Sequence, residues 1–365
     1  MGRRFKWLGA AAALVITGQV VTGQAWGADA PTALEKRFAE LARLPAAERT
    51  SQMVELAKKE GSLKMLPIMQ SKLGRDHTSM FEKAYPFIKV QYEDIGSEDM
   101  AERFMIEETS GKHLMDLVSL SLPDMYHVVT RKLTARYPTP ATDSILPIYA
   151  SFKHPEGLWV PAYWKEHGIS YNPSMLKEEE APKSYADLCK PEFKGQVSYE
   201  VIHNPWLTGM YFVFNKDEKK LEEWIACVGK SEPIMQNGHT SRLMLMMAGD
   251  HAIMGENAIY NGTVANMKNP KKAPFKAVYT AEILAYPSVM SISNHAANPM
   301  SAGLYADWVL GKESQDFIAK EFRSPITVPH PYMPSDAQIV NVPYLDAATT
   351  ERIHAIWTKY TIRKR

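Results

Sequence analysis

The feature that most constrains the fold is an alternation of predicted strands and helices in the first third of the chain. LKMLPIM (63–69) is a short apolar run, and IKVQYEDI (88–95) alternates polar and apolar residues as a half-buried strand does. DLVSLS (116–121) is nearly continuous in its apolar character, which is typical of a strand buried inside a parallel sheet. Segments with helical apolar spacing separate these runs. This order predicts an α/β fold.

A second series of the same kind follows residue 173. VSYEVI (197–202) and HAIMGE (251–256) are predicted strands, with helical segments between them. The region 137–173, rich in proline and aromatic residues, and the run YPSVMSIS (286–293) are predicted to cross between two lobes. A length of 365 residues also favours two lobes over a single core.

Local signals predict several element boundaries. Thr50 or Ser51 is placed to cap a helix that ends at Gly61, and Thr240 is a candidate cap for the helix SRLMLMMAG. Pro67 cannot donate a backbone hydrogen bond, so the first strand is expected to be irregular or at a sheet edge.

The N-terminus has the layout of a secretory signal peptide. Basic residues at positions 3, 4 and 6 precede the apolar run 7–21, and Ala25-Trp26-Gly27 places small residues before a cleavage site after Gly27. We therefore expect residues 1–27 to be removed and the mature chain to reside in the periplasm.

The charge of the mature chain argues against nucleic acid as a partner. The segment 1–27 holds three of the 42 Lys and Arg residues, so 39 remain against 41 Asp and Glu, a net charge of −2. Cys189 and Cys227 could form one disulfide in an exported chain or remain two buried thiols, and their spacing does not decide.

Local motifs for an enzyme are missing from the sequence. It contains no HExxH, GxSxG, GxGxxG or GxxxxGK[ST] pattern, and the two cysteines do not form a CxxC pair. The sequence therefore offers no local argument for catalysis.

Four segments carry a family resemblance. They are FEKAYPFIKVQYEDIGSEDMAERFMIEETSGKHLMDLVSLS (81–121), GISYNPSMLKEEEAPKSYADLCKPEFKGQVSYE (168–200), AGDHAIM (248–254) and the stretch from Asn298-Pro299 to Gln315. In this order they resemble bacterial extracellular solute-binding proteins of ABC importers, most closely the ferric-iron-binding branch. The resemblance implies a two-lobed, type II-like periplasmic-binding-protein fold with a hinge and an interlobe ligand cleft. It further implies a monomer without catalytic residues that captures a small solute by lobe closure and delivers it to an ABC importer permease.

The resemblance also implies a domain division. The expected parts are a signal peptide (1–27), an N-terminal helical extension (28–60), lobe one (61–162 plus about 286–325), lobe two (163–285) and a C-terminal segment packing on the lobes (326–365).

Candidate ligand-binding residues lie at predicted strand ends and helix starts, which converge at a cleft between α/β lobes. In lobe one and the crossing region they are Gln70, Ser71, Ser97, Ser119, Ser121, Tyr163 and Lys165. In lobe two they are His203, Asn204, Asn237, His239, Thr240, Glu256, Asn257, Tyr260 and Asn261. Ser97 serves equally as a plain helix cap, and His203 as a partly buried structural histidine.

The segment GENAIYNG (255–262) bears on whether the solute is iron. Ferric iron favours anionic oxygen, so Tyr260 and Glu256 are candidate metal ligands if ferric iron is the transported ligand. Iron-type relatives commonly offer two adjacent tyrosines here, whereas Asn261 follows Tyr260. A small oxyanion, carboxylate or phosphorylated solute stays an open alternative. A periplasmic enzyme on a two-lobed scaffold and a ligand sensor subunit also stay open.

Overall fold

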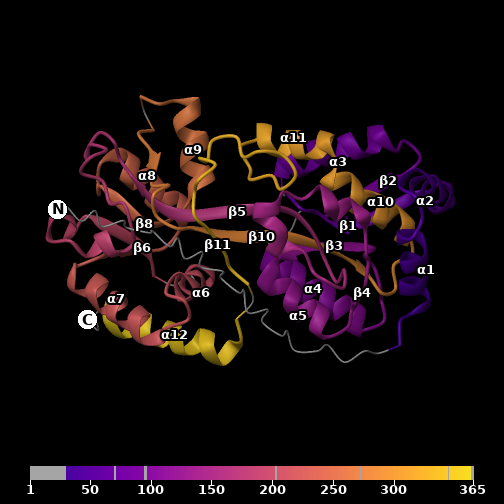
Figure 1. Ribbon diagram of the computed structural model, residues 1–365, viewed down its shortest axis with the longest axis horizontal. Coiled ribbons are helices and arrows are strands. Elements are labelled where there is room, and N and C mark those ends of the chain that lie inside the picture. The colour runs from indigo at the N-terminus through magenta and orange to yellow at the C-terminus, as the bar shows by residue number, and fades with distance from the viewer. Residues whose placement is uncertain are drawn as a thin grey trace, which may run out of the picture. The chain divides into compact units, whose positions relative to one another are not determined.

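In the part of the chain that the computed structural model describes, the strands form a single mixed sheet of 11 strands (Figure 1). The strands are β1 (Ser62–Leu66), β2 (Lys89–Tyr92), β3 (Leu117–Ser121), β4 (Thr134–Ala135), β5 (Val160–Tyr171), β6 (Val197–Glu200), β7 (Ile234–Gln236), β8 (Ile253–Ala258), β9 (Lys276–Ala277), β10 (Ile283–Ser293) and β11 (Ile339–Asn341). The structure describes residues 30–69, 71–93, 97–201, 204–271, 273–343 and 345–362. From Thr32 onward these residues belong to one compact unit. The predicted α/β fold class is confirmed.

The sheet consists of two parallel groups joined by two long antiparallel strands. Its main path runs β2-β1-β3-β10-β5-β8-β6-β7. Strands β2, β1 and β3 are parallel to one another, as are β8, β6 and β7. β10 is antiparallel to β3 and to β5, and β5 is antiparallel to β8. The crossings predicted within 137–173 and at 286–293 therefore correspond to β5 and β10.

Helices cover both faces of this sheet (Figure 1). They are α1 (Ala33–Ala42), α2 (Ala46–Glu60), α3 (Ser71–Ala84), α4 (Ser97–Thr109), α5 (Leu122–Thr130), α6 (Asn204–Val213), α7 (Glu218–Lys230), α8 (His239–Ala248), α9 (Ile259–Lys268), α10 (Pro299–Leu310), α11 (Lys312–Lys320) and α12 (Ala347–Thr361). Short 3-10 helices occur at Pro140–Ser144, Pro147–Phe152, Ala186–Cys189 and Pro191–Phe193. Within the described residues, none of these helices is long and apolar enough to cross a bilayer.

Buried apolar side chains form two clusters. One contains Trp164 and Tyr305 and receives residues from α1, α2, β1, α3 and α10. The other contains Trp206, Trp224 and Trp357 and receives residues from β6, α6, α7 and α12. The first cluster also contains Leu243, Met254 and Phe275 from the predicted second lobe, so the clusters do not correspond one to one with the predicted lobes.

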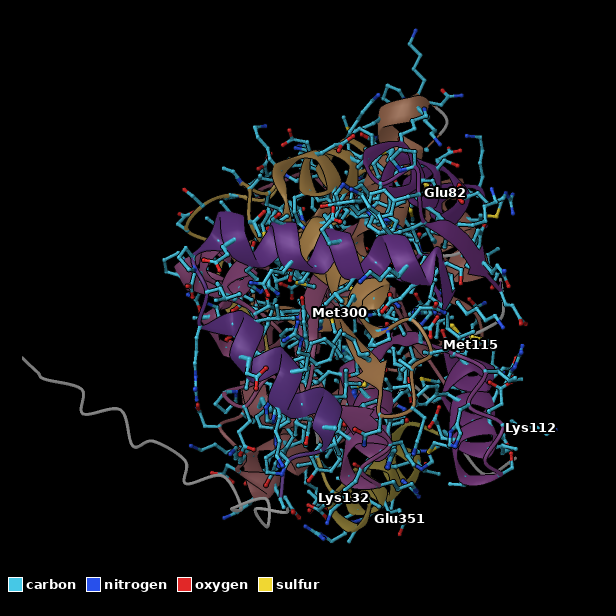
Figure 2. The ribbon with its side chains drawn as sticks, turned by 90° about the vertical axis from the view of Figure 1, so that its right-hand side faces the viewer. Glu82, Lys112, Met115, Lys132, Met300 and Glu351 are labelled. Carbon is cyan, nitrogen blue, oxygen red and sulfur yellow. A yellow bond between two sulfur atoms is a disulfide. The ribbon has the colours of Figure 1, made fainter. Side chains whose placement is uncertain are left out.

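The N-terminal helix α2 packs on α10. The Glu60 carboxylate at the end of α2 accepts hydrogen bonds from the backbone N–H groups of Met300 (3.0 Å) and Ser301 (2.7 Å) at the start of α10. Figure 2 looks onto this face, with Met300 labelled. A carboxylate at a helix N-terminus satisfies free donors and complements the helix dipole.

Three boundary predictions are wrong, and each has a physical reason. α2 begins at Ala46 after Pro45, so Thr50 lies inside the helix, where its hydroxyl donates to the Ala46 carbonyl (2.9 Å). α8 begins after Gly238 and no side chain caps it, so Thr240 is already helical. β1 ends before Pro67 and pairs with strands on both sides, so it is internal to the sheet. The predicted helix end at Gly61 is confirmed, with φ 68°.

The C-terminal segment and the disulfide both stabilise the second core. α12 packs against α7 and α6. Cys227 of α7 is joined to Cys189 in a disulfide, with 5.8 Å between their Cα atoms. The sequence left this bridge open because spacing alone carries no information about distance in the fold.

Burial of His77 predicts a pH dependence of stability. His77 in α3 contacts Ser314 (2.7 Å between Nε2 and Oγ) and Trp308, and burial lowers its pKa from 6.5 to about 3. Between these values the unfolded chain binds a proton that the folded chain does not, so stability falls as pH falls. Urea titrations at pH 6 and pH 4 measure how much the free energy of unfolding falls over this range. We expect this fall to be smaller in His77→Gln than in the parent, by about 1 kcal/mol per pH unit. The exposed His127→Gln is the control. Equal slopes for His77→Gln and the parent would contradict the prediction.

Candidate functional site

A cavity of 380 Å³ lies where the ends of β1 and β3 meet the start of α9. Its lining residues are Pro67, Ile68, Met69, Lys72, Leu73, Met100, Ser119, Leu120, Ser121, Tyr163, Lys165, Tyr260, Ser288 and Arg323. Four of the predicted ligand-binding residues, Ser119, Ser121, Tyr163 and Tyr260, are therefore brought together, along with Lys165. They come from both parallel groups of the sheet and from the strands that join them.

The serine wall of the cavity follows from the pairing of β3 with β10. Ser121 pairs with Ser288 in register, and the Ser119 hydroxyl lies 3.5 Å from that of Ser288. Ser121 also caps α5, where its hydroxyl donates to the Asp124 carboxylate (2.6 Å). Hydroxyls at a strand end beside a helix N-terminus can donate hydrogen bonds to an anionic group.

Tyr163 ties β5 to the chain leaving β1. Its hydroxyl donates to the Ile68 carbonyl at 3.0 Å, and its side chain is almost fully buried. This bond holds the segment 67–69 against the cavity. Because the Tyr163 hydroxyl already donates its proton to a carbonyl, Tyr163 lines the cavity without offering a free hydrogen-bond donor.

The segment GENAIYNG is a strand-to-helix junction rather than a loop. Glu256 and Asn257 lie inside β8, and Tyr260 lies in the first turn of α9. The glycines at both ends allow close packing: a Cβ on Gly255 would lie 2.3 Å from the Tyr199 ring, and one on Gly262 would lie 2.1 Å from the Phe275 ring. The junction turns Tyr260 toward the cavity.

Arg323 stacks on Tyr260. The guanidinium carbon lies 4.0 Å from the ring centroid, within the range of a cation–π contact. Burial lowers the pKa of Arg323, but the phenol groups of Tyr260 and Tyr163, together with the charge of Glu166, outweigh this effect, and the pKa is raised overall. Arg323 is thus a permanent cation held at the cavity wall.

A buried carboxylate fixes the segment that carries Arg323. Glu166 of β5 is fully buried and accepts hydrogen bonds from the hydroxyls of Ser324 and Tyr332. The Nε2 atom of His330 lies 3.2 Å from the same carboxylate. Burial, together with the charge of Glu166, raises the pKa of Tyr332. These bonds hold residues 323–332 against β5, so Arg323 and Lys165 lie on the same cavity.

The cavity wall is cationic. Lys72, Lys165 and Arg323 line it, and its described lining includes no Asp or Glu. Lys72 forms an exposed ion pair with Asp76. Among the described residues, Lys165 and Arg323 form no ion pair with a carboxylate. Lys165 is the one residue of β5 that is not fully buried. Cations placed this way favour an anionic ligand.

A second cavity of 340 Å³ adjoins the first and shares Lys72, Leu73, Tyr260 and Arg323 with it. Its further lining residues are Asp76, Asn261, Val264, Lys268 and Glu321. The Arg323–Tyr260 pair thus forms a wall common to both cavities, and the predicted candidate Asn261 lies on the far side of it.

Glu256, the second candidate iron ligand, lies inside a buried ion-pair network. Arg242, itself fully buried, forms an ion pair with Glu256 and lies 3.3 Å from the Glu200 carboxylate. His167 and His239 lie 3.2 Å and 3.3 Å from the same Glu256 oxygen. Glu256 is not among the described lining residues of either cavity. The structure therefore brings His239 to Glu256, whereas Tyr260 faces the cavity.

The remaining candidates are placed as follows. Asn237 and Thr240 are exposed at the start of α8, and Asn257 is buried with its amide donating to the Ser170 hydroxyl (3.3 Å). Gln70 and His203, and the side chains of Ser71, Ser97 and Asn204, lie outside the described residues.

The sequence analysis missed Lys72, Ser288 and Arg323. Lys72 adjoins the candidates Gln70 and Ser71, and Ser288 lies inside the predicted crossing strand, so both had a local signal. Arg323 had none, because it follows α11 and reaches the cavity through the bonds made by Glu166.

Comparisons with known proteins agree with this architecture. Residues 117–344 match the family described as bacterial extracellular solute-binding protein. No curated protein matched the chain. One similar solved structure is iron-bound HitA from Pseudomonas aeruginosa, with a TM-score of 0.63 and 15% identity, covering 82% of this chain and 99% of that one. A second is Trichodesmium IdiA (FutA) in complex with iron and citrate ligands, with a TM-score of 0.69 and 13% identity, covering 83% of this chain and 100% of that one. A third is a Bordetella ferric binding protein, with a TM-score of 0.67 and 17% identity, covering 82% of this chain and 98% of that one. At these identities the likeness concerns the fold.

The chain belongs to the bacterial extracellular solute-binding protein family, whose model spans more than half of its length. The predicted two-lobed binding-protein fold is confirmed by the solved structures it resembles. The protein's function is ligand capture rather than catalysis, in agreement with the prediction that it is not an enzyme.

The buried network around Glu256 predicts a structural role for this residue. Glu256→Gln leaves Arg242 buried beside a neutral amide, with the Glu200 carboxylate as its remaining ion-pair partner among the described residues. We expect the free energy of unfolding from urea titration to fall by roughly 3 kcal/mol. Glu178→Gln, which removes the exposed ion pair with Lys276, is the control and should leave stability nearly unchanged. A Glu256→Gln variant as stable as the parent would contradict the structural role.

Proposed function

We propose that this protein captures a small anionic solute in the 380 Å³ cavity and delivers it to an ABC importer permease. The solute is an oxyanion, a carboxylate or a phosphorylated compound. The observation that carries this proposal is the cationic wall: Lys165 and Arg323 face the cavity without carboxylate partners among the described residues. The signal-peptide layout of residues 1–27 supports export to the periplasm, where the protein acts as a monomer.

The hydroxyl groups around the cavity suit the same class of ligand. Ser119 and Ser288 offer hydroxyls on one wall, beside Ser121, whose proton is directed to Asp124, and Tyr260 offers a phenol on another wall. An anion held between these donors and the side chains of Lys165 and Arg323 receives charge-assisted hydrogen bonds from several elements at once. The lobes then close on the ligand because the closed state makes more of these contacts than the open state.

Ferric iron carried together with an anion is the second candidate. Two of the structurally similar proteins are named as iron-bound, one of them with citrate. Ferric iron prefers anionic oxygen ligands, and Tyr260 is the cavity residue that can supply a phenolate. A bare ferric ion would meet three cations and no described carboxylate, so the partner anion would neutralise the wall.

Affinity measurements with charge-removal variants test the anionic ligand. Inorganic phosphate, citrate and ferric citrate are titrated separately by calorimetry. We expect at least one anion to bind without iron, and Arg323→Gln and Lys165→Gln each to weaken it by about 10- to 100-fold through the loss of a charge-assisted hydrogen bond. Lys83→Gln is the matched control, because Lys83 is exposed on the same helix as Lys72.

Absorption spectroscopy separates the two candidates. Iron bound through Tyr260 gives a visible phenolate-to-iron band that Tyr260→Phe removes. Ferric citrate binding with this band, combined with no affinity for any iron-free anion, would replace the anionic solute by the iron–anion complex. Anion affinity unchanged in both charge-removal variants would overturn the cavity assignment.

A further inference from the structure

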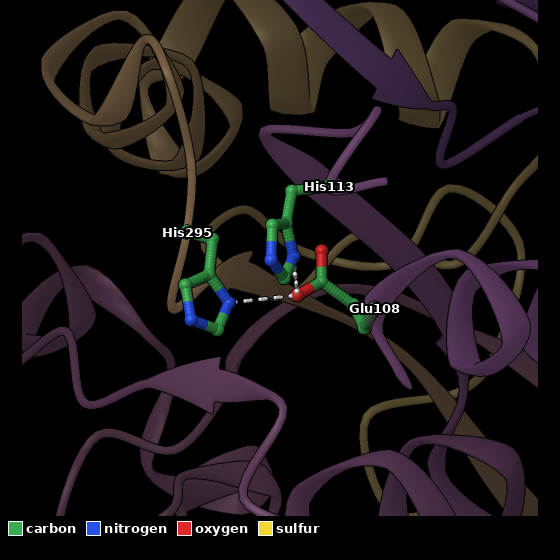
Figure 3. Close-up of side chains that lie close together, drawn as sticks. All are labelled: Glu108, His113 and His295. Carbon is green, nitrogen blue, oxygen red and sulfur yellow. Dashed lines mark hydrogen bonds and ion pairs between the residues drawn. The ribbon is translucent and has the colours of Figure 1, made fainter. Parts of the chain in front are cut away.

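A second cluster of polar side chains lies away from the ligand cavity, at the other end of β3. Glu108 of α4, His113 and His295 meet there, as Figure 3 shows. The Nδ1 atoms of His113 and His295 lie 3.0 Å and 3.1 Å from the same oxygen, Oε2 of Glu108. The two imidazole rings stack with their centroids 3.8 Å apart.

The sheet topology brings these distant residues together. β3 and β10 are antiparallel, with Leu117 paired to Ile292, so the chain entering β3 lies beside the chain leaving β10. His113 precedes β3 and His295 follows β10. The cluster is therefore built on two strands whose opposite ends carry the serine wall of the ligand cavity.

The carboxylate of Glu108 lacks a built-in cation. Its side chain is 0% exposed, and within the described residues no Lys or Arg forms an ion pair with it. Its other oxygen, Oε1, accepts a hydrogen bond from the Ser293 hydroxyl at 2.8 Å. A buried carboxylate is normally compensated by a cation or a metal ion, and here the neighbours able to supply charge are the two imidazoles.

The backbone at His113 is held in an uncommon conformation. Its φ is 43°, in the left-handed region that costs a non-glycine residue roughly 1 kcal/mol or more. This conformation directs the ring to Glu108. Ser293 positions both His295 and Glu108. Its hydroxyl accepts a hydrogen bond from the backbone N–H of His295 at 3.0 Å and donates one to the Glu108 carboxylate. Both histidines and the carboxylate are thus oriented before any ion arrives.

We propose that Glu108, His113 and His295 bind a first-row divalent transition-metal ion, with Zn²⁺ as the reference ion, at a site separate from the solute cavity. Two imidazole nitrogens and one carboxylate oxygen are a common ligand set for zinc, with solvent in the fourth position. The ion lies between the two Nδ1 atoms and Oε2, and each ring then carries its N–H on Nε2. His295, whose side chain is 56% exposed, leaves the fourth position open to water.

The ligand spacing suits tetrahedral coordination. Ligand atoms 2.0–2.1 Å from zinc are about 3.3 Å apart along a tetrahedron edge. The two N–O separations of 3.0 Å and 3.1 Å are close to this value, and the three ligand atoms lie within 4.8 Å of one another. The two stacked rings would have to move apart so that both Nδ1 atoms point at one ion, while the two N–O separations would stay almost unchanged. The bound ion ties the chain entering β3 to the chain leaving β10.

The other group of similar composition is less suited to a cation. Glu200, His239 and Glu256 also lie within reach of one another, but the guanidinium of Arg242 already occupies the space between the two carboxylates. A divalent ion there would lie against a fixed positive charge. This contrast provides a matched control, since both groups contain a histidine and a buried glutamate.

Zinc titration of the full-length protein, purified without a histidine tag and stripped with EDTA, tests the site. Calorimetry with ZnCl₂ should show one equivalent bound, and saturating zinc should raise the melting temperature by about 3 °C or more. His295→Ala and Glu108→Gln should abolish this binding. Ser293→Ala, which removes the hydrogen bond to Oε1, should weaken it by about 10- to 100-fold.

Two control variants make the result specific. His239→Ala disrupts the other histidine–glutamate group and Tyr260→Phe alters the solute cavity, and both should bind zinc as the parent does. No stoichiometric binding by the parent would overturn the proposal, as would parent-like binding by His295→Ala. Loss of zinc in His239→Ala or Tyr260→Phe alone would assign the ion to those places instead. If Glu108→Gln fails to fold, the exposed His295→Ala still decides.

Discussion

The pairing of β5 with β10 is the interaction on which the rest of the structure depends. These two long, almost wholly buried strands join the two parallel groups, and each contributes directly to the cavity through Tyr163, Lys165 and Ser288. The other walls attach to them: β3 through its ladder with β10, and β8, which leads to Tyr260, through its ladder with β5. The cavity is therefore lined by side chains attached to both parallel groups of the sheet.

The charge of the cavity depends on where the nearby carboxylates are used. Lys165 and Glu166 are consecutive in β5, and neighbouring residues of a strand point to opposite faces. Lys165 faces the cavity, while Glu166 is satisfied on the other side by Ser324 and Tyr332. Glu256 is likewise compensated inside the protein by a buried arginine. The acids are compensated inside the scaffold and the cations face the cavity, which is the opposite of what a bare metal ion requires.

Local periodicity predicted the strands and helices well, because burial of one face leaves a repeating signal in the sequence. The helix starts near Thr50 and Thr240 were wrong, since a capping residue is also tolerated inside a helix when its hydroxyl bonds back to the backbone or faces solvent. Tyr260 was found because a glycine-flanked polar segment follows a strand. Arg323 could not be found, because its position depends on contacts with Glu166 across more than 150 residues of chain.

The two histidine–glutamate groups show why residue type alone does not define a site. Glu256 with His239 and Glu108 with His295 would look alike in sequence, and the second pair is separated by 187 positions. The difference lies in a third residue. Arg242 completes the first group with a cation from the chain itself, so the group is a structural network. The second group has a preorganised carboxylate and two imidazoles but no Lys or Arg among the described residues, so it can accept a cation from solution where the first group cannot.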